Sequence, residues 1–353
     1  MREEFDAFLQ VRRIVPVTHD VTSFVFEAPQ EWTGRFDAGQ HLILMLEIDG
    51  APVERCYTIS SPPTRSGTLT ITTKRQTDGV VSPWMHDHLQ VGERVRARGP
   101  FGDFTLQSAE PQVPADSPMK YLFLSAGSGI TPSMSMTRAL ADSGSDADVA
   151  FVHSARTPTD IIFRQELDAI CESGLDIRVA HVCEADAVGD RWHGARGRLG
   201  LDLMNWLVPD VLEREVFLCG PPGYMAGTTE LLDALGVDPD RVHRESFLVG
   251  ESGQLFAADD VEVEETTGMH VELRASGRVV TIAAGSTVLE AVIAGGVMLR
   301  SSCRQGMCGT CKLTLVEGEV DMRHQGGIRP REIAQGSFLP CCSRPLTDLV
   351  IDA

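Results

Sequence analysis

Four cysteines near the C-terminus constrain this chain more than any other feature. Cys303, Cys308 and Cys311 follow a C-x4-C-x2-C spacing, and Cys341 lies 30 positions beyond the last of them. This is the ligand spacing of a [2Fe–2S] cluster, which needs four thiolates. A structural zinc ion is the alternative, but zinc sites usually pair two short cysteine knuckles, and here the fourth cysteine belongs to no second knuckle. The pattern therefore predicts an iron–sulfur cluster on these four thiols.

Composition places the chain among globular proteins with several domains. Its 353 residues exceed what one hydrophobic core normally holds, so two or three domains are expected. The N-terminus has no apolar signal region, and no stretch approaches the ~18 apolar residues of a membrane span. Nine cysteines in a chain without a secretion signal indicate reduced thiols rather than a disulfide framework. These features predict a cytoplasmic protein outside the membrane.

The charge of the chain argues against two classes of partner. A formal net charge of −19 disfavours binding to nucleic acid or to an anionic membrane surface. The charge is uneven, because residues 266–353 hold nine Lys and Arg against eight Asp and Glu. The acidic run from Asp259 to Glu265 carries part of the excess, and we interpret it as a solvated linker.

Two segments have the composition of linkers. The segment from Pro111 to Pro118 is rich in proline and continues neither a strand nor a helix. The second begins at Gly250 and runs through the acidic residues. The predicted divisions are a domain over residues 1–112, a domain over 119–249, an acidic linker over 250–265 and a domain over 266–353.

The three domains differ in their strand patterns. Short apolar strands between turn residues, at 21–26, 41–48, 67–73 and 94–97, predict a small antiparallel β-barrel in the first domain. Strands alternating with helices predict a doubly wound parallel α/β sheet in the second. Its expected strands are 121–125, 149–152, 177–182 and 216–219, with helices ending near Asp142 and over 163–173. In the third domain we expect strands at 269–274 and 279–282, then a helix from an N-cap at Ser286 to Ala294.

The first domain carries a pattern suited to a phosphate and a flat ring. Arg55 and Tyr57 stand two positions apart, so both side chains lie on one face of a strand. Ser82 as N-cap with Pro83 after it predicts a helix start, and helix N-termini bind phosphate. The guanidinium can then hold a phosphate while the tyrosine ring lies against a heterocycle. Taken alone, each signal is also typical of an ordinary barrel surface.

Together with the turn from Gly99 to Phe104, these residues resemble the ferredoxin-NADP reductase superfamily. Its flavin-binding barrel carries an R-x-Y-[ST] strand, a Gly-x-x-Ser loop and a G-P-x-G-x-F turn. The turn is similar to the FAD-binding branch, whereas a related branch uses FMN. The resemblance implies that Arg55 and Ser82 bind the pyrophosphate of FAD, with Gly79 in the same loop as Ser82. It also implies that Tyr57 lies on the flavin ring, that Thr58 bonds near N5, and that Ser60 binds the cofactor at the end of the strand motif.

The second domain contains a strand followed by a glycine turn and a helix start. Gly127-Ser-Gly129-Ile-Thr131-Pro132 forms this turn and predicts a phosphate cradle. In the same superfamily, G-x-G-I-T-P binds the NAD pyrophosphate. A C-G-P motif like the one at Cys219 and Gly220 puts its cysteine beside the nicotinamide. The resemblance thus implies NAD binding by Gly127, Gly129, Thr131, Pro132 and Gly220, and a catalytic set of Tyr57, Thr58 and Cys219. The alternative for Cys219 is a buried strand thiol.

Two further residues are expected near the bound cofactors, at or after the strands of the second domain. Phe247 lies where members of the superfamily place an aromatic side chain near the flavin, and a core position is the alternative. Arg156 follows the second parallel strand, where an adenosine ribose lies in such sheets. One arginine is thin support for a second phosphate, so NADH is predicted over NADPH.

In order, the three domains resemble a chain of flavin, NAD and ferredoxin-like modules, the last a β-grasp domain. The resemblance implies that NADH passes a hydride to FAD and that single electrons leave through the cluster. Segments 192–198 and 209–217 are similar to reductase components of Rieske-type monooxygenases that demethylate glycine betaine and related quaternary amines. A Rieske-type oxygenase is therefore the implied partner. The alternatives are the NADH reductase of hybrid-cluster protein, which has the same architecture, and a redox-sensing module.

Overall fold

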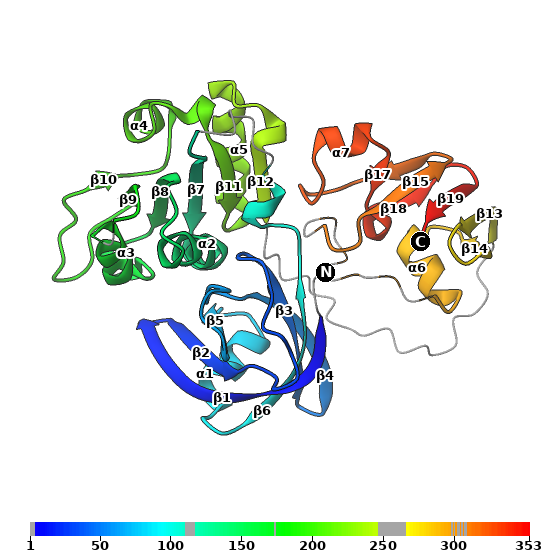
Figure 1. The fold of residues 1–353 in the computed structure, drawn as a ribbon, viewed down its shortest axis with the longest axis horizontal. Coiled ribbons are helices and arrows are strands. Elements are labelled where there is room, and N and C mark those ends of the chain that lie inside the picture. Colours follow the sequence, from blue (N-terminus) through cyan, green and yellow to red (C-terminus); the bar gives the residue numbers. More distant parts are fainter. Residues whose placement is uncertain are drawn as a thin grey trace. The chain divides into compact units, whose positions relative to one another are not determined.

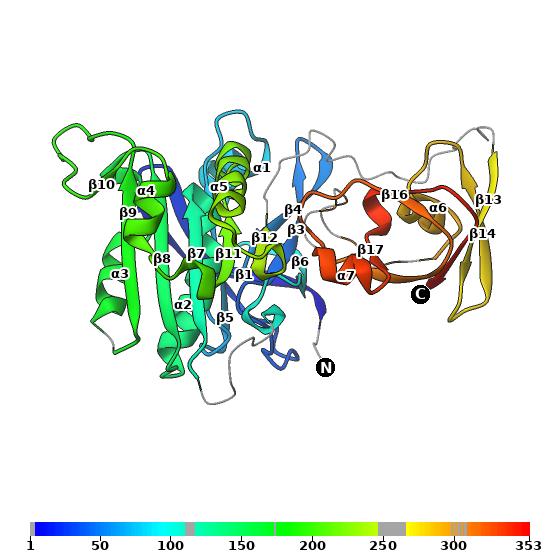
Figure 2. The same cartoon turned by 90° about the horizontal axis from the view of Figure 1, so that it is seen from above.

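The chain folds into two compact units, Met1–Gly253 and Gln254–Ala353. A computed structural model describes residues 4–109, 117–172, 174–245, 266–297, 299, 301, 304, 306 and 309–353. Figures 1 and 2 show both units as ribbons. The predicted acidic linker and residues 111–116 of the proline-rich segment lie outside the described residues.

The first sheet of the first unit is antiparallel throughout, in the order β4-β3-β6-β1-β2-β5. An isolated bridge between Ile59 and Ile71 joins the segment after β4 to β5, so the two edges of the sheet meet. The predicted β-barrel is thereby confirmed. Its elements are β1 Phe5–Thr18, β2 Val21–Glu27, β3 His41–Ile48, β4 Ala51–Thr58, β5 Thr68–Lys74, α1 Val81–His88 and β6 Arg94–Phe101.

The barrel contains one strand that the sequence pattern does not predict. β1 is 14 residues long, but paired arginines and a proline interrupt its apolar alternation, and its register shifts twice against β2. The hairpin between β3 and β4 has a clear local cause. Asp49 and Gly50 both take positive φ, 54° and 77°, as a two-residue hairpin turn requires.

The second sheet of the first unit is parallel, in the order β10-β9-β8-β7-β11-β12. The strand order reverses between β7 and β11, and ligands of such sheets bind at this switch point, beyond the carboxyl ends of the strands. The predicted doubly wound sheet is confirmed. Its elements are β7 Lys120–Ala126, α2 Ile130–Asp142, β8 Asp148–Ala155, α3 Arg164–Cys171, β9 Ile177–Cys183, β10 Ala195–Arg196, α4 Leu201–Leu207, β11 Glu215–Cys219, α5 Pro222–Leu235 and β12 Val242–Glu245.

Both faces of the parallel sheet are covered, so its central strands are apolar at nearly every position. On one face Phe123 packs with α2, α3 and barrel residues such as Phe104. On the other face Leu122 packs with α4 and α5. The barrel therefore lies against the α2 side of the sheet, within one unit.

The second unit is built on a five-stranded sheet in the order β14-β13-β19-β15-β17. β13 and β19 pair in parallel and the other neighbours are antiparallel, with α6 packed on the apolar face. This mixed sheet with a covering helix is the predicted β-grasp arrangement. The elements are β13 Thr266–Leu273, β14 Arg278–Ala283, α6 Val288–Ala294, β15 Leu313–Glu317, β16 Val320–Met322, α7 Pro330–Ala334, β17 Ser337–Phe338, β18 Ser343–Pro345 and β19 Leu349–Asp352.

Two predicted helix caps are wrong by one or two residues. The N-cap of α6 is Thr287 rather than Ser286, because only Thr287 lies three positions before Glu290 and exchanges hydrogen bonds with it. The helix α1 already begins at Val81, so Ser82 lies inside its first turn. The hydroxyl of Ser82 instead accepts a hydrogen bond from the amide of Gln76, at 3.1 Å.

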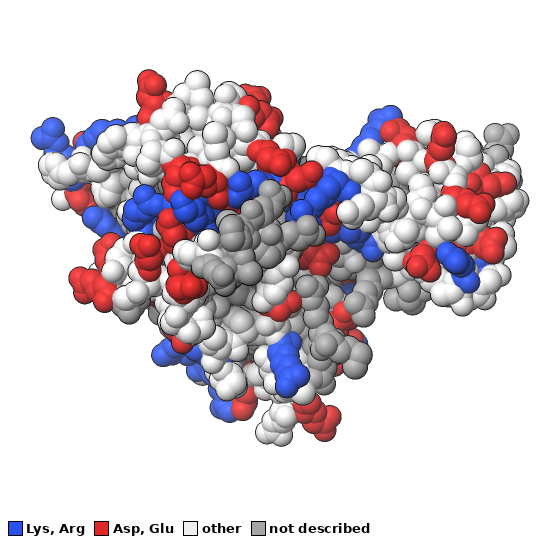
Figure 3. Space-filling model, turned by 45° about the horizontal axis from the view of Figure 1, so that its top comes forward, with Lys and Arg blue, Asp and Glu red and all other residues white. Residues whose placement is uncertain are grey.

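Charged side chains of both signs are interleaved on the face drawn in Figure 3. Oppositely charged side chains of the described residues often pair, as Lys120 does with Glu213 at 2.6 Å. Arg214, whose side chain is 0% exposed, pairs with both Asp148 and Asp210, at 2.8 Å each. No helix in the described part of the chain is both long and apolar enough to cross a membrane.

Candidate functional site

The strand β4 presents three of the predicted flavin residues. Arg55 and Tyr57 are half-buried at alternate positions, so they share a face. Burial raises the pKa of the Tyr57 hydroxyl, against an opposing effect of Arg55. Thr58 is 3% exposed, and its Oγ1 atom has no hydrogen-bond partner among the described residues. A buried hydroxyl of this kind fits a bound ligand, since buried polar groups are otherwise nearly always paired.

The other predicted flavin residues are Ser60, in the barrel, and Gly79 and Ser82, in the loop and first turn of α1. The hydroxyl of Ser60 is buried and bonded to Thr72 at 2.9 Å, so it is already occupied within the barrel. Gly79 lies close to Ser82, because a Cβ placed at Gly79 would be 3.4 Å from the Ser82 Oγ. The amide of Gly79 also donates to the carbonyl of Gln76, at 3.1 Å, which closes the loop before α1. These bonds form a tight loop at the start of a helix.

The turn from Gly99 to Phe104 packs on a buried histidine. Gly102 has a φ of 103°, and a Cβ there would lie 2.9 Å from Nδ1 of His41. His41 lies 3.9 Å from Oε1 of Glu245 at the end of β12. Burial lowers the pKa of His41 to about 4, although Asp103 opposes the shift. The turn, the barrel and the parallel sheet thus meet around one neutral imidazole.

The predicted nucleotide turn lies at the switch point of the parallel sheet. Gly127 to Gly129 form a 3₁₀ turn between β7 and α2, and Thr131 donates a hydrogen bond to the Ser128 carbonyl at 3.1 Å. A Cβ at Gly129 would lie 2.4 Å from the carbonyl oxygen of Cys219. The glycine turn and the C-G-P motif therefore touch, and only glycine fits at the contact. Pro132 lies in the first turn of α2, where its missing amide costs no helical hydrogen bond.

Cys219 ends β11 with a fully buried side chain. Burial raises the pKa of its thiol well above the usual value, and Glu245, opposite it in register on β12, raises that pKa further. The thiol is therefore protonated near neutral pH. The neighbouring Gly220 is packed against Tyr224, because a Cβ there would lie 2.7 Å from the tyrosine ring.

A row of polar residues that sequence reasoning missed crosses the carboxyl end of the sheet. Ser125 pairs in register with Cys219 on one side and with His153 on the other, and His153 pairs with His181. The Ser125 hydroxyl lies 2.9 Å from Nδ1 of His153. Burial, helped by His181, lowers the pKa of His153 to about 3, so its ring is neutral. The signal in the sequence is a polar residue at the same late position of each apolar strand.

One predicted residue, Arg156, stands at the edge of this site. Arg156 is exposed and directly follows β8, and its carbonyl accepts a hydrogen bond from Ala185 at 2.9 Å. Phe247 lies outside the described residues. The region around the switch point therefore brings together Gly129, Cys219 and Gly220 but leaves Arg156 at the rim.

The cluster segment brings two of the four predicted cysteines together. The Sγ atoms of Cys311 and Cys341 lie 3.2 Å apart, while Cys303 and Cys308 lie outside the described residues. The loop before Cys311 turns sharply, with positive φ at Arg304, Gly306 and Gly309 of 53°, 71° and 72°. Backbone turns with positive φ can form concavities that bind anions and iron–sulfur groups. The described residues therefore fit a [2Fe–2S] cluster.

Cys341 and Cys342 lie in a 3₁₀ turn, Pro340–Cys342. These two neighbouring residues therefore do not form an extended segment in which their side chains would simply alternate. The Cys342 thiol packs on the loop instead, because a Cβ at Gly306 would lie 2.6 Å from its Sγ. Lys312, next to Cys311, is fixed by Glu332 of α7 at 2.8 Å. Although burial raises the pKa of Glu332, hydrogen bonds from Arg329 and Lys312 hold it at about 2.

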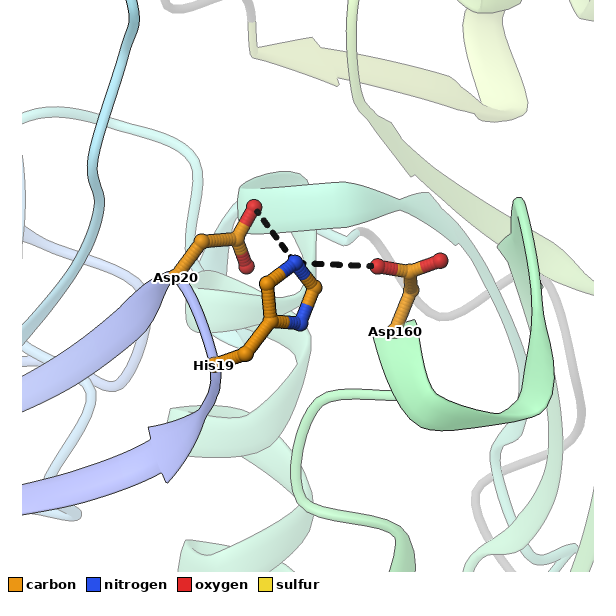
Figure 4. A group of neighbouring side chains, drawn as sticks. All are labelled: His19, Asp20 and Asp160. Atoms are coloured by element: carbon orange, nitrogen blue, oxygen red, sulfur yellow. Dashed lines mark ion pairs between the residues drawn. The ribbon is translucent and has the colours of Figure 1, made fainter. Parts of the chain in front are cut away.

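A group of titratable side chains between the barrel and the parallel sheet is drawn in Figure 4. Nε2 of His19 lies 3.8 Å from Asp20 and 3.9 Å from Asp160. Asp20 is already paired with Lys74 at 2.9 Å, and Asp160 accepts a 2.6 Å hydrogen bond from Thr157. We interpret the group as an electrostatic contact between the two sheets.

Three family descriptions match the chain in the order of its sheets. An oxidoreductase FAD-binding domain matches residues 9–106, an oxidoreductase NAD-binding domain matches 123–230, and a 2Fe-2S iron-sulfur cluster binding domain matches 271–346. The predicted FAD, NAD and [2Fe–2S] cofactors are thereby confirmed.

Curated relatives match almost the whole chain. The glycine betaine monooxygenase reductase subunit of Pseudomonas aeruginosa is 40% identical over 348 residues, which cover 96% of this chain and 93% of the relative. The stachydrine N-demethylase reductase subunit of Rhizobium meliloti is 38% identical, with 96% and 94% covered. The 3-ketosteroid-9-alpha-monooxygenase ferredoxin reductase component of Mycobacterium tuberculosis is 32% identical, with 97% and 94% covered.

Solved structures share the fold. Full-length CYP116B46 from Tepidiphilus thermophilus superposes with a TM-score of 0.68 at 25% identity, over 99% of this chain and 42% of that one. The Amycolatopsis cytochrome P450 reductase GcoB gives 0.59 at 25% identity, over 70% and 71%. Since the relatives are matched along nearly their full length, the chain belongs to the family of FAD-, NAD- and [2Fe–2S]-binding reductases that are the reductase components of monooxygenases.

Proposed function

We propose that this chain supplies electrons from NADH to a Rieske-type oxygenase that demethylates glycine betaine or a related quaternary amine. The observation that carries the proposal is the 40% identity, over 96% of the chain, to glycine betaine monooxygenase reductase subunits. When bound, FAD takes up electrons as a pair and the [2Fe–2S] cluster passes them on singly. The protein's own residues supply binding, orientation and exclusion of water.

The barrel residues are proposed to hold FAD. Arg55 and the Gly79 to Ser82 loop would bind the pyrophosphate, Tyr57 would lie on the ring, and Thr58 would bond near N5. The buried Oγ1 of Thr58, which has no hydrogen-bond partner within the described part of the chain, supports this assignment. Ser60 contributes through its backbone, since its hydroxyl is bonded to Thr72.

The switch point is proposed to hold the NADH. Gly127, Gly129, Thr131 and Pro132 would receive the pyrophosphate, with Gly220 leaving room for the nicotinamide beside Cys219. Because the thiol of Cys219 is buried and protonated, it acts by packing and hydrogen bonding rather than as a thiolate. Arg156 would lie by the ribose, and Phe247 is proposed to cover the flavin.

The proposal extends to the cluster ligands, the domain limits and the location. Cys303, Cys308, Cys311 and Cys341 are the proposed ligands, and the limits are those given for the sequence. A cytoplasmic location is proposed because a reducing compartment keeps such thiols free to bind iron.

Reconstitution with purified oxygenases tests the function. The flavin- and cluster-loaded protein is mixed with NADH, a Rieske oxygenase active on glycine betaine, and that substrate, and release of the demethylated amine is measured. Turnover that depends on this chain is expected. Electron delivery to hybrid-cluster protein but to no oxygenase would favour the alternative reductase, and absence of any NADH-driven turnover would favour a sensor.

A further inference from the structure

Helix α2 links the two cofactor segments of the first unit. It begins directly after the Gly127 to Gly129 turn. Three of its residues, Ser135, Arg138 and Asp142, lie on one face, at spacings of three and four. All three bind the barrel segment of residues 60–65, which directly follows β4. One helix therefore connects the proposed nucleotide turn to the proposed flavin strand.

Arg138 is the central member of this face. It is 8% exposed, and its Nη1 donates to the carbonyl of Ser60 at 2.6 Å. Its Nε and Nη2 form a fork on both carboxylate oxygens of Glu166 in α3, at 2.7 and 2.6 Å. The guanidinium also lies over the ring of Phe163, 4.6 Å from its centroid. Such planar, bidentate pairing is specific to arginine.

The barrel segment that Arg138 contacts is also held by hydrogen bonds within the barrel. Ser60 is bonded through its hydroxyl to Thr72, which is bonded in turn to Ser23 at 2.8 Å. The neighbouring carbonyl of Ser61 accepts a 2.9 Å hydrogen bond from Ser135. The segment is thus fixed between buried hydroxyls of the barrel and two side chains of α2.

At the outer end of the same face of α2, the contact with the barrel is exposed to solvent. Arg65 forms a fork on Asp142 at 2.8 and 2.7 Å, but its side chain is 55% exposed. Exposed pairs of this kind contribute little to stability, because water and salt screen them. The buried bonds of Arg138 and Ser135 are therefore the part of the contact that can set geometry.

We propose that Arg138 is a positioning residue for hydride transfer. It holds the backbone after Thr58 at a fixed distance from the nucleotide turn and so aligns the nicotinamide with the flavin. Loss of alignment by about 1 Å can slow such a step by up to ~100-fold. The inference rests on the proposed function, since it assumes that β4 and the Gly127 turn hold the two reacting cofactors.

Rapid-reaction kinetics on the holoprotein test this role. Arg138→Met is expected to lower the limiting rate of flavin reduction by NADH by about tenfold or more, with FAD still bound. The kinetic isotope effect with 4-deuterated NADH should rise, because hydride transfer then limits the rate more fully. Ser135→Ala, which leaves no charge unpaired, should produce a smaller loss of the same kind. Arg138→Lys should recover part of the rate through the bond to Ser60.

A matched control and a measurement without turnover separate positioning from stability. Arg65→Met, at the exposed end of the same face, should stay within about twofold of the wild type. Amide hydrogen exchange in the segment 59–72 should speed up in Arg138→Met and stay unchanged in Arg65→Met. If Arg138→Met lowers the melting temperature but leaves the limiting rate and isotope effect unchanged in flavin-loaded protein, the inference is wrong. If wild-type protein is not reduced by NADH at all, the proposed function fails instead.

Discussion

The thiols of Cys311 and Cys341 lie 3.2 Å apart although 30 positions separate them in the chain. Both are nearly buried, at 5% and 6% exposure. The adjacent Cys342 faces Gly306 of the loop instead. The position of the Cys341 thiol beside Cys311 supports the choice of Cys341, rather than Cys342, as the fourth thiol of the cysteine pattern.

Cys341 is therefore expected to be the fourth cluster ligand. In Cys341→Ser protein most of the iron and the visible absorption of the cluster should be lost. The Cys342→Ser protein is the matched control and should keep its iron, since the Cys342 thiol packs against Gly306 and contacts the Leu339 carbonyl at 3.6 Å. Iron analysis after anaerobic purification measures both, and loss confined to Cys342→Ser would reverse the assignment.

The flavin released from the protein should be FAD, in a ratio of one to the cluster. The Gly99 to Phe104 turn motivates this prediction, because Gln40 holds the Gly102 carbonyl at 3.2 Å and His41 fills the space beneath Gly102. Acid extraction followed by chromatography identifies the flavin. Recovery of FMN would show that this turn does not distinguish the two cofactors here.

The stability of the first unit should fall as the pH drops below neutral. His41 and His153 have folded pKa values near 4 and 3, depressed by burial, against an unfolded value of 6.5. Between the folded and unfolded pKa values the unfolded chain binds more protons, so stability is fully present above about pH 6.5 and decreases below it. Each histidine should lower the free energy of unfolding by about 1–2 kcal/mol between pH 7 and pH 5.

Denaturant unfolding at pH 7 and pH 5 measures this dependence. His153→Gln should show a smaller loss of unfolding free energy between the two pH values than the wild type, because glutamine does not titrate. The exposed His88 is a suitable control position for the same replacement of histidine by glutamine. An equal loss in all three proteins would contradict the argument.

Local patterns predicted most of the fold and part of the site. The strand β3 and the helix α2 follow from apolar periodicity and a glycine turn, and the cluster from cysteine spacing. The row of Ser125, His153 and Cys219 was not predicted, because a polar residue late in each strand is visible in the sequence but the neighbours it meets depend on the register of strands far apart. The contact of Arg138 with Ser60 is of the same kind, since it spans 78 positions.

NADH should be used in preference to NADPH. Arg156 is the one basic residue directly after β8. Next to it, the backbone amide of Glu184 donates a hydrogen bond to the carbonyl of Ala155, at 3.2 Å. The carboxylate of Glu184 is paired with Arg198 at 3.4 Å, so the prediction rests on the single arginine directly after β8. The ratio of kcat/KM values for the two nucleotides should favour NADH by about tenfold or more, which is ~1.4 kcal/mol. A ratio that favours NADPH would overturn this prediction.

The electron path should be separable at the boundary between the two units. The proposed flavin and nucleotide residues all lie in Met1–Gly253, which has cores of its own, whereas the cluster cysteines lie in Gln254–Ala353. A chain that ends at Gly253 is expected to bind FAD and to reduce ferricyanide with NADH. Ferricyanide accepts electrons directly from a flavin, so this reaction reports on the first unit alone.

The same truncated chain should fail with acceptors that take electrons from the cluster. Reduction of cytochrome c and support of the oxygenase should both fall to a small fraction of the full-length rates, at equal flavin content. The full chain carrying Cys341→Ser is the matched control, because it loses the cluster but keeps the second unit, and it should fail in the same way. If instead the truncated chain drives its oxygenase as fast as the full chain does, the cluster is not the outlet for electrons, whatever the cysteines of the second unit bind.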